Sequence, residues 1–255
     1  MKLTKAYQDR DFLMSEEART VRILCEYLEP ERRFRLADIH NSVIFFGSAR
    51  LGPKTREYHD AANLAEKVAH WTMKTHRKRD RYYVVTGGGP GLMQAVHEGA
   101  ARVERKLNIG LNISLPFEQH VNPHVDRARA LEFHYFFMRK FWFMNLARAA
   151  VILPGGFGTF DELFELLTLT QTGKSARMPI ILFGREFWQN AVNLPLLAKH
   201  GLISPEDLEL FQFADTVDEA FDLLREGLEA PDAPPELKPT SAFKRVAKAK
   251  PNPSR

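Results

Sequence analysis

The sequence has a single cysteine, Cys25, and no continuous apolar run of the roughly 18 residues that a membrane-spanning helix needs. One cysteine excludes an intrachain disulfide framework and a zinc site built from several thiolates. The first ten residues also lack the apolar segment of a secretory signal peptide. We therefore expect a cytoplasmic protein with no membrane partner.

The sequence has little net charge outside its last residues. Its 36 lysines and arginines face 32 aspartates and glutamates, which gives a formal net charge of +4. Residues 238–255 hold six of these cations and no acid, so the rest of the chain carries 30 against 32, a net of −2. A nearly neutral body is not typical of a nucleic-acid-binding fold, and weak contact with RNA or lipid is expected only through this tail. Residues 231–255 are predicted to form a disordered basic tail, since they are rich in proline and lysine and lack periodicity.

Short apolar runs alternate with segments of helical periodicity between residues 41 and 230. The apolar runs lack the alternation of half-buried strands, which indicates strands that are covered on both faces in a parallel sheet. With right-handed crossovers, this pattern predicts a Rossmann-like, doubly wound α/β domain with helices on both faces. Strands are expected at about residues 42–48, 82–86, 108–115, 132–137, 151–153, 179–184 and 211–214. Helices are expected at about residues 57–74, 92–103, 138–149, 160–172, 186–200, 205–211 and 216–229.

Residues 1–40 precede the first predicted strand and are expected to add a helical extension to the domain. Its helix is predicted to begin near Ser15 and to end before Pro30, because proline disrupts a helix interior. Four residues at helical spacing are expected to form the stripe that packs against the main domain: Val21, Leu24, Cys25 and Leu28.

The most informative stretch is residues 151–162, with the sequence VILPGGFGTFDE. It predicts a buried strand, a glycine turn and the start of a helix. The N–H groups at a helix N-terminus attract anions, and Gly155, Gly156 and Gly158 have no side chains to keep a phosphate away. A purely structural interpretation stays open, because Thr159 and Glu162 also fit a capping box.

Further glycines and a basic pair follow other predicted strands. Residues 47–48 and 87–91 each follow a strand, and Arg139 with Lys140 opens the helix before the strand at 151–153. In an open α/β sheet, ligands bind beyond the carboxyl ends of the strands, so these segments can share one crevice. A basic pair at a helix N-terminus opposes the helix dipole by about 0.3–1 kcal/mol per charge, which indicates an anion nearby.

The glycine clusters do not match a dinucleotide or P-loop fingerprint. Residues 47–52 lack the middle glycine of G-x-G-x-x-G, residues 87–91 have the wrong spacing, and neither cluster continues as Gly-Lys-Ser/Thr. A mononucleotide fits better, with its phosphate on the turn at residues 155–159. Glu162 and Arg139 could then lie at the ribose, and this arrangement suits cleavage of an N-glycosidic bond through an oxocarbenium-like state.

The chain resembles the Lonely Guy (LOG) family at four motifs over roughly residues 42–225. These motifs are FGSAR at 46–50, GGGPGLM at 87–93, MRK at 138–140 and PGGFGTFDE at 154–162. The resemblance implies a Rossmann-like fold and a nucleoside 5′-monophosphate phosphoribohydrolase, which releases adenine or a cytokinin base and ribose 5-phosphate. It also implies a homodimer or larger assembly that needs no metal or organic cofactor.

The same resemblance implies that Arg139 and Glu162 form the catalytic pair. The substrate-binding residues that it implies are Lys140 beside Arg139; Gly155, Gly156, Gly158 and Thr159 at the phosphate; Ser48, Gly88, Gly89 and Gly91 in the nucleotide pocket; and Glu118 and Thr168 at further contacts. The segment at 137–143 is more aromatic than in short plant-like members, which leaves the preferred base open.

Members of this family are often labelled lysine decarboxylases, and that label does not fit the residues. Pyridoxal phosphate needs a Schiff-base lysine with supporting partners, and the phosphate chemistry already uses Lys140. We therefore expect hydrolysis of AMP or a related purine nucleotide. The alternatives are a non-catalytic carrier or sensor of a phosphorylated ligand such as molybdopterin, and a protein that contacts nucleic acid through residues 238–255.

Overall fold

The computed structural model describes residues 3–115 and 120–230, which form an α/β fold around one parallel sheet. The seven strands of this part of the chain have the order β4-β3-β2-β1-β5-β6-β7, and every neighbouring pair is parallel. The strands are β1 (Asn41–Phe46), β2 (Tyr82–Thr86), β3 (Asn108–Ile113), β4 (Ala130–Phe133), β5 (Ala147–Ile152), β6 (Ile180–Phe183) and β7 (Gln212–Ala214). The predicted Rossmann-like, doubly wound parallel sheet is confirmed.

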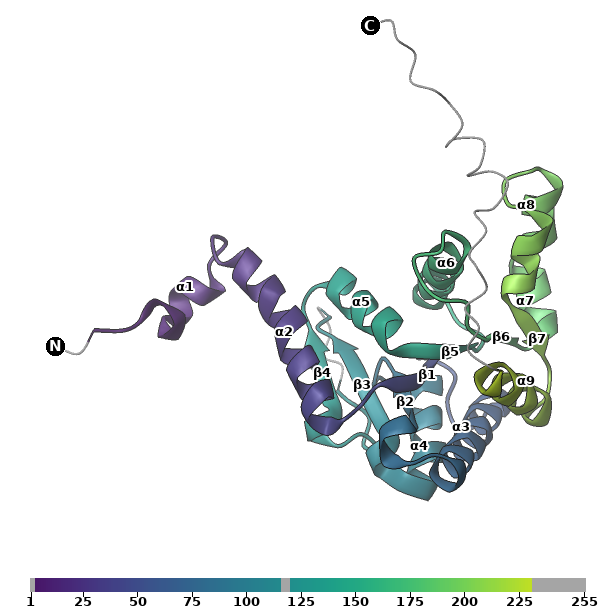
Figure 1. The fold of residues 1–255 in the computed structure, drawn as a ribbon, viewed down its shortest axis with the longest axis horizontal. Helices are drawn as coiled ribbons and strands as arrows, with labels where there is room; N and C mark the ends of the chain where they lie inside the picture. The colour runs from purple at the N-terminus through teal and green to yellow at the C-terminus, as the bar shows by residue number, and fades with distance from the viewer. Residues whose placement is uncertain (1–2, 116–119, 231–255) are drawn as a thin grey trace, which may run out of the picture.

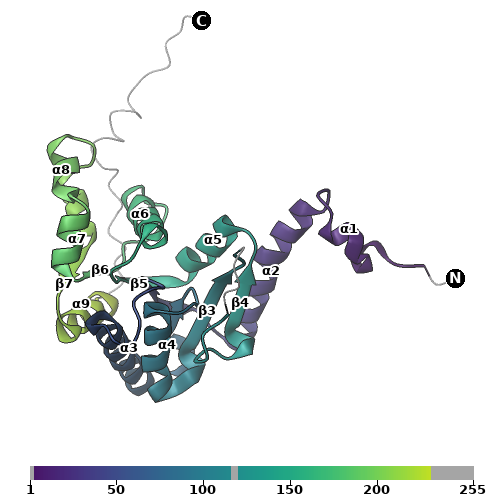
Figure 2. The ribbon, with the colours of Figure 1, turned by 180° about the vertical axis from the view of Figure 1, so that it is seen from behind.

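Helices cover both faces of the sheet (Figure 1). One face carries α3 (Arg56–Thr75), α4 (Leu92–Glu104) and α9 (Val217–Glu229), and the other carries α5 (Phe136–Leu146) and α6 (Phe157–Gln171). The short helices α7 (Arg185–Ala191) and α8 (Leu194–Lys199) lie toward the β6–β7 edge (Figure 2). Short 3₁₀ helices occur at Ala6–Gln8, Lys78–Asp80, Arg105–Leu107, Arg127–Arg129 and Pro205–Leu210. None of the helices in these described residues is long and apolar enough to cross a membrane.

The strand order reverses between β1 and β5. The chain winds outward from β1 to β4 and then returns to the other side of β1 with β5, and Phe46 pairs in register with Ile152. The two strands therefore end level with each other, and the loops that follow them diverge to opposite faces. Such a topological switch point is where open α/β sheets bind ligands.

Two of the predicted element boundaries around β4 and β5 are wrong. Residues 132–137 were expected to form one strand, but β4 ends at Phe133 and α5 begins at Phe136. The aromatic residues favour a strand, yet Phe136 and Phe137 are exposed and Met138 is buried, as on an amphipathic helix. The helix expected to reach residue 149 ends at Leu146, because residues 147–152 pair with β1.

Two helical predictions near the C-terminal end of the described residues also need correction. The single helix expected at residues 186–200 is divided into α7 and α8, and Asn193 caps the second of them through a hydrogen bond from Leu196 N. The segment near 205–211 is a 3₁₀ helix with a capping box formed by Ser204 and Asp207. The predicted tail at residues 231–255 lies outside the described residues.

The N-terminal segment forms α1 (Arg10–Met14) and α2 (Arg19–Ala37), and α1 extends beyond the α/β body (Figures 1 and 2). The predicted end before Pro30 is wrong, since α2 continues seven residues past it. The predicted stripe is also wrong, because all four of its residues are exposed. A different face of α2 packs on α5, where the buried Phe34 contacts Trp142.

The α3–α4 contact predicts a test of the packing. Gly99 in α4 lies so close to α3 that an added Cβ would meet the carbonyl oxygen of Ala62 at 1.8 Å. Gly99→Ala should therefore lower the free energy of unfolding by at least about 2 kcal/mol, although alanine is the better helix former. Urea unfolding measures this loss. Gly52→Ala, where a Cβ meets nothing within 4 Å, is the control; equal stability of the two variants would contradict this account.

Candidate active site

A cleft of about 900 Å³ opens at the carboxyl ends of β1, β2 and β5, at the switch point of the sheet. Its walls come from the β1–α3 loop, the β2–α4 loop, the start of α5 and the start of α6. Six residues singled out from the sequence line it together: Ser48, Arg139, Gly156, Gly158, Thr159 and Glu162. The convergence of distant motifs that the parallel topology predicts is therefore present.

The amino end of α6 presents bare backbone to this cleft. Gly156 is the N-cap residue, no side chain caps the helix, and the first turn holds no acidic residue. A Cβ on Gly156 or Gly158 would meet nothing within 4 Å, so there is open space beside both residues. The first-turn N–H groups and the positive end of the helix dipole make this turn suited to an anion.

The capping box considered for Thr159 and Glu162 does not form. The helix begins at Phe157, so Thr159 lies within the first turn instead of at the N-cap. Thr159 instead packs against Gly155, where an added Cβ would lie 2.2 Å from Thr159 Oγ1. Glu162 points away from the N-cap backbone and bonds to another helix.

Backbone hydrogen bonds of Ser48 connect the loops that form the cleft. Its backbone N–H donates to the carbonyl of Pro154 at 3.0 Å, and its carbonyl accepts from Leu92 N at 2.9 Å. Gly91 has a φ of +66°, and a Cβ there would lie 2.4 Å from the carbonyl oxygen of Ser48. Glycine is required at this position both for its backbone conformation and for the close approach of the two loops.

A buried polar network supports the β2–α4 glycine loop from behind. Asn122 Nδ2 lies 3.0 Å from the carbonyl oxygen of Gly88, 3.2 Å from that of Gly89 and 3.0 Å from His97 Nδ1. His97 Nε2 lies 3.2 Å from the carbonyl oxygen of Ile109, which can only accept, so Nε2 carries the proton and Nδ1 accepts from Asn122. Burial lowers the pKa of His97 to about 3, which keeps the ring neutral and this arrangement of donors intact.

Arg139 and Glu162 form an ion pair at the bottom of the cleft. Arg139 Nη2 donates to Glu162 Oε1 at 2.8 Å, and the two side chains are only 13% and 8% exposed. The guanidinium also lies 5.5 Å and 5.6 Å from the ring centroids of Phe136 and Phe143. These aromatic faces provide cation–π contacts and keep water from the pair.

The Glu162 carboxyl has a strongly altered acidity. Burial raises its pKa to about 7, Arg139 and Lys140 oppose this rise, and the neighbouring Asp161 adds to it. The group therefore changes charge near neutral pH. A carboxyl with this pKa can stabilise a developing positive charge when ionised and can exchange a proton with water.

Lys140 points to a different partner than its neighbour Arg139. Its Nζ lies 2.7 Å from Asp161 Oδ1 and 3.1 Å from Glu165 Oε2, so it binds the outer side of α6. Burial works against its charge, but the hydrogen bonds to these two carboxylates raise the pKa of Lys140 overall. In this structure Lys140 joins α5 to α6 and does not line the cleft.

Several other residues that were expected at the site are described by the structure but do not line the cleft. Gly88, Gly89, Gly91 and Gly155 build the loops behind it, and Thr168 lies six residues along α6 from Glu162. Glu118 lies outside the described residues. Their roles in binding stay predictions.

The sequence reasoning missed the apolar wall of the cleft. This wall contains Met93, Ile113, Leu115, Phe136 and Phe157. Phe157 is 96% exposed at the amino end of α6, and Phe136 is also exposed. Hydrophobic periodicity assigns such residues to the core, and the aromatic run near Phe136 was the only signal of their presence. This wall reaches the anion cradle, the turn at residues 156–159, through Phe157, and an apolar wall beside an anion site suits a ligand with a flat, weakly polar part.

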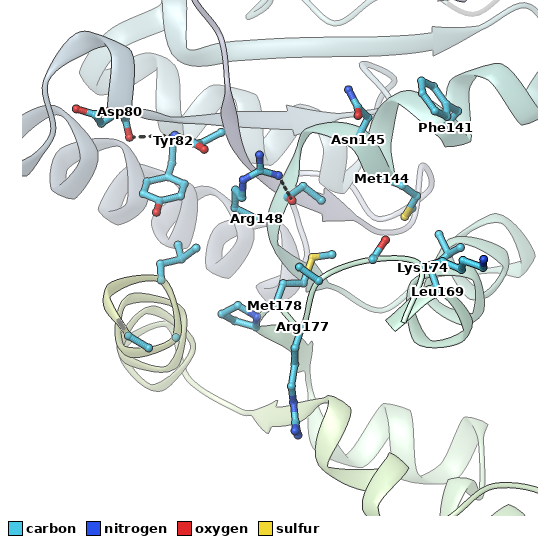
Figure 3. A pocket seen from close by; sticks show the side chains of 18 of the residues that line it. Asp80, Tyr82, Phe141, Met144, Asn145, Arg148, Leu169, Lys174, Arg177 and Met178 are labelled. Atoms are coloured by element: carbon cyan, nitrogen blue, oxygen red, sulfur yellow. Dashed lines mark hydrogen bonds between the residues drawn. The ribbon is translucent and has the colours of Figure 1, made fainter. Parts of the chain in front are cut away.

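A second cleft, of about 770 Å³, lies at the amino ends of the strands (Figure 3). Its arginines already bond to backbone carbonyls: Arg148 Nη1 donates to Ala147 O at 3.0 Å, and Arg177 Nη2 donates to Glu209 O at 2.9 Å. The Arg139–Glu162 pair and the glycine turns lie at the opposite ends of the strands.

Within the described residues, no group of three or more His, Cys, Asp or Glu side chains is placed to hold a metal ion.

The fold and the cleft define a doubly wound α/β protein with an anion cradle at its switch point. The model of the family described as "Possible lysine decarboxylase" matches residues 93–224. Cytokinin riboside 5′-monophosphate phosphoribohydrolase LOG3 of Arabidopsis thaliana is 30% identical over 191 residues, covering 72% of this chain and 80% of the relative. LOG2 of the same plant is 34% identical over 149 residues, covering 57% and 61%. The chain belongs to the LOG family.

A solved structure supports the fold independently. The X-ray structure of TM1055, a structural genomics target, is similar over 73% of this chain and 99% of its own, at 21% identity and a TM-score of 0.50. At this identity the likeness concerns the arrangement of helices and strands alone.

The raised pKa of Glu162 predicts a specific pH dependence of stability. Between its ordinary value of 4.5 and about 7, the folded protein holds a proton at Glu162 that the unfolded chain has lost. Stability therefore falls as the pH rises through this range. From pH 5 to pH 8, the free energy of unfolding of the wild type should fall by on the order of 1–3 kcal/mol more than that of Glu162→Gln. Urea unfolding at both pH values measures the difference, and parallel pH profiles would refute the assignment.

Proposed function

We propose that this protein hydrolyses the N-glycosidic bond of a purine nucleoside 5′-monophosphate, AMP or a cytokinin nucleotide, and releases the free base and ribose 5-phosphate. One observation carries the proposal: the buried Arg139–Glu162 pair lies beside an uncapped helix N-terminus in a single cleft. The relatives named as cytokinin riboside 5′-monophosphate phosphoribohydrolases support the same reaction.

The spacing along α6 fits a nucleotide. Phe157 opens the helix and Glu162 follows five residues later, which is about 7.5 Å along the axis. This is the scale of a ribose 5-phosphate. With the phosphate on the N–H groups of Phe157, Gly158 and Thr159, the sugar extends toward Glu162. The base then lies against the apolar wall that contains Phe136.

The chemistry follows from these positions. The bond between C1′ and the base nitrogen breaks, its electron pair leaves with the base, and positive charge develops on the ribose. The ionised Glu162 carboxylate stabilises this charge. A water molecule adds to C1′, and its proton passes to the carboxylate and on to the base. Arg139 fixes the carboxylate in place through its 2.8 Å hydrogen bond.

Further parts of the proposal concern assembly and location. Phe137 and Phe141 on α5 and Phe164 on α6 are exposed in the single chain, and such apolar surface favours a homodimer or larger assembly. We also propose a cytoplasmic location and a reaction that needs no metal or organic cofactor. The other residues implied by the family resemblance, including Lys140, Ser48 and Thr168, remain proposed substrate contacts.

The direct test is incubation of the purified protein with AMP, GMP, CMP and an N6-modified AMP, followed by chromatography for free base. Glu162→Gln should reduce base release by about 100-fold or more, since the amide cannot stabilise the developing charge. Glu132→Gln, at an exposed carboxyl on β4 that accepts a hydrogen bond from the Ser114 hydroxyl, is the matched control and should retain activity. Binding of the nucleotides without release of base by the wild type would contradict the proposal and favour a carrier.

The pH profile gives a second test. Because the ionised form of Glu162 is the active one, base release should rise with pH around the carboxyl pKa of about 7 and then level off. The rate of base release at saturating AMP, measured from pH 5.5 to 8.5, checks this. A rate that falls with pH over the same range would show that Glu162 acts in its protonated form.

A further inference from the structure

The N-terminal helix α2 lies outside the sheet and its crossovers, yet it holds the helix that carries Arg139. The contact runs along α5, and Tyr27 and Phe34 of α2 both pack against the ring of Trp142. Arg33 adds a hydrogen bond from its Nη1 to the carbonyl of Ala130, which opens β4 just before α5. The extension is therefore joined to the polypeptide that leads into Arg139.

The carboxylate of Glu26 on α2 bonds the amino end of α5. Its two oxygens accept from His134 N at 2.7 Å and from Tyr135 N at 3.2 Å. Tyr135 is the N-cap residue of α5, and no side chain of its own segment caps this helix. Glu26 thus bonds the backbone N–H of the N-cap residue from another helix, as the N3 glutamate of a capping box does within its own helix, and its charge is favourable at the positive end of the dipole.

The backbone of the same residue bonds the middle of α5. Pro30 has no N–H, so the carbonyl of Glu26 four residues earlier lacks its usual partner within α2. Trp142 Nε1 donates to this carbonyl at 2.9 Å, and the Trp142 side chain is buried. Pro30, which the sequence predicted as the helix end, instead lies inside α2 and leaves the Glu26 carbonyl free to accept a hydrogen bond from α5.

Arg139 lies between these two attachment points. Its backbone N–H donates to the carbonyl of Tyr135 at 3.2 Å, and Trp142 follows it by three residues. A shift of the amino end of α5 would carry the guanidinium away from Glu162, and a hydrogen bond of 2.8 Å weakens steeply with such a shift.

We propose that Glu26 is a positioning residue, which fixes the amino end of α5 and thereby holds the Arg139 guanidinium on Glu162. The importance of this contact for catalysis rests on the proposed function, but the contact itself does not. The N-terminal extension then has a defined role: it sets the geometry of the ion pair in the cleft.

The acidity of Glu162 reports on this geometry. Among the residues that the structure describes, the charged groups that act on Glu162 are Arg139 and Lys140 on α5 and Asp161 on its own helix, and both cations lower its pKa. If Glu26 is removed, α5 can move and this lowering weakens. The pKa of Glu162 should then rise above the wild-type value by about one unit in Glu26→Ala, and by less in Glu26→Gln, which keeps one acceptor oxygen.

The measurement is a carboxyl ¹³C NMR titration of the full chain, with Glu162→Gln used to assign the signal. Glu31→Gln is the matched control, because Glu31 is an exposed carboxyl on the same helix α2 and takes no part in the contacts with β4 and α5 described above. Its Glu162 signal should titrate as in the wild type. If Glu26→Ala does not fold, Glu26→Gln, which preserves the size of the side chain, provides the readout.

Activity gives a second readout. The pH midpoint of base release from AMP should shift upward in Glu26→Ala in parallel with the NMR titration, and Glu26→Gln should restore part of the shift. A folded Glu26→Ala protein with a wild-type Glu162 titration would overturn the positioning role. If the wild type releases no base, the proposed function fails, while the NMR titration still decides the role of Glu26.

Discussion

The buried ion pair between Arg139 and Glu162 is the interaction on which the rest of the site depends. Burying two charges is costly, and removing one partner of such a pair typically costs about 3–5 kcal/mol, because the other charge is left without compensation. The pair joins α5 to α6 across the switch point, and Lys140 joins the same helices again through Asp161 and Glu165. The two helices that flank the cleft are thus held together by charge, at the place where the sheet topology leaves an opening.

The sequence predicted the sheet well because its strands are buried on both faces. Runs such as residues 43–46 and 151–153 are almost wholly inaccessible, and unbroken apolar runs are the expected signature of such strands. The helix limits were harder to predict, because tertiary contacts decided them. Pro30 is tolerated within α2 since its missing N–H leaves a carbonyl that Trp142 bonds, and Phe136 and Phe137 are helical despite their strand propensity.

The same difference between local sequence patterns and tertiary contacts explains which parts of the candidate site could be predicted. Backbone features such as the glycine turn at 155–158 and the helix after it are determined by consecutive residues, so the sequence predicts them. Side-chain directions are not: neighbouring residues Arg139 and Lys140 point to different partners, and the apolar wall of the cleft is formed by residues from separate elements. The link between Glu26 and α5 joins residues more than 100 positions apart and has no sequence pattern of its own.

The most direct test of this account is a crystal structure of Glu162→Gln with AMP bound. We predict that the phosphate lies within hydrogen-bond distance of the backbone N–H groups at residues 157–159, with the ribose between that turn and the side chains at 139 and 162. A nucleotide seated in the cleft at the amino ends of the strands, or a ribose turned away from residues 139 and 162, would contradict the account.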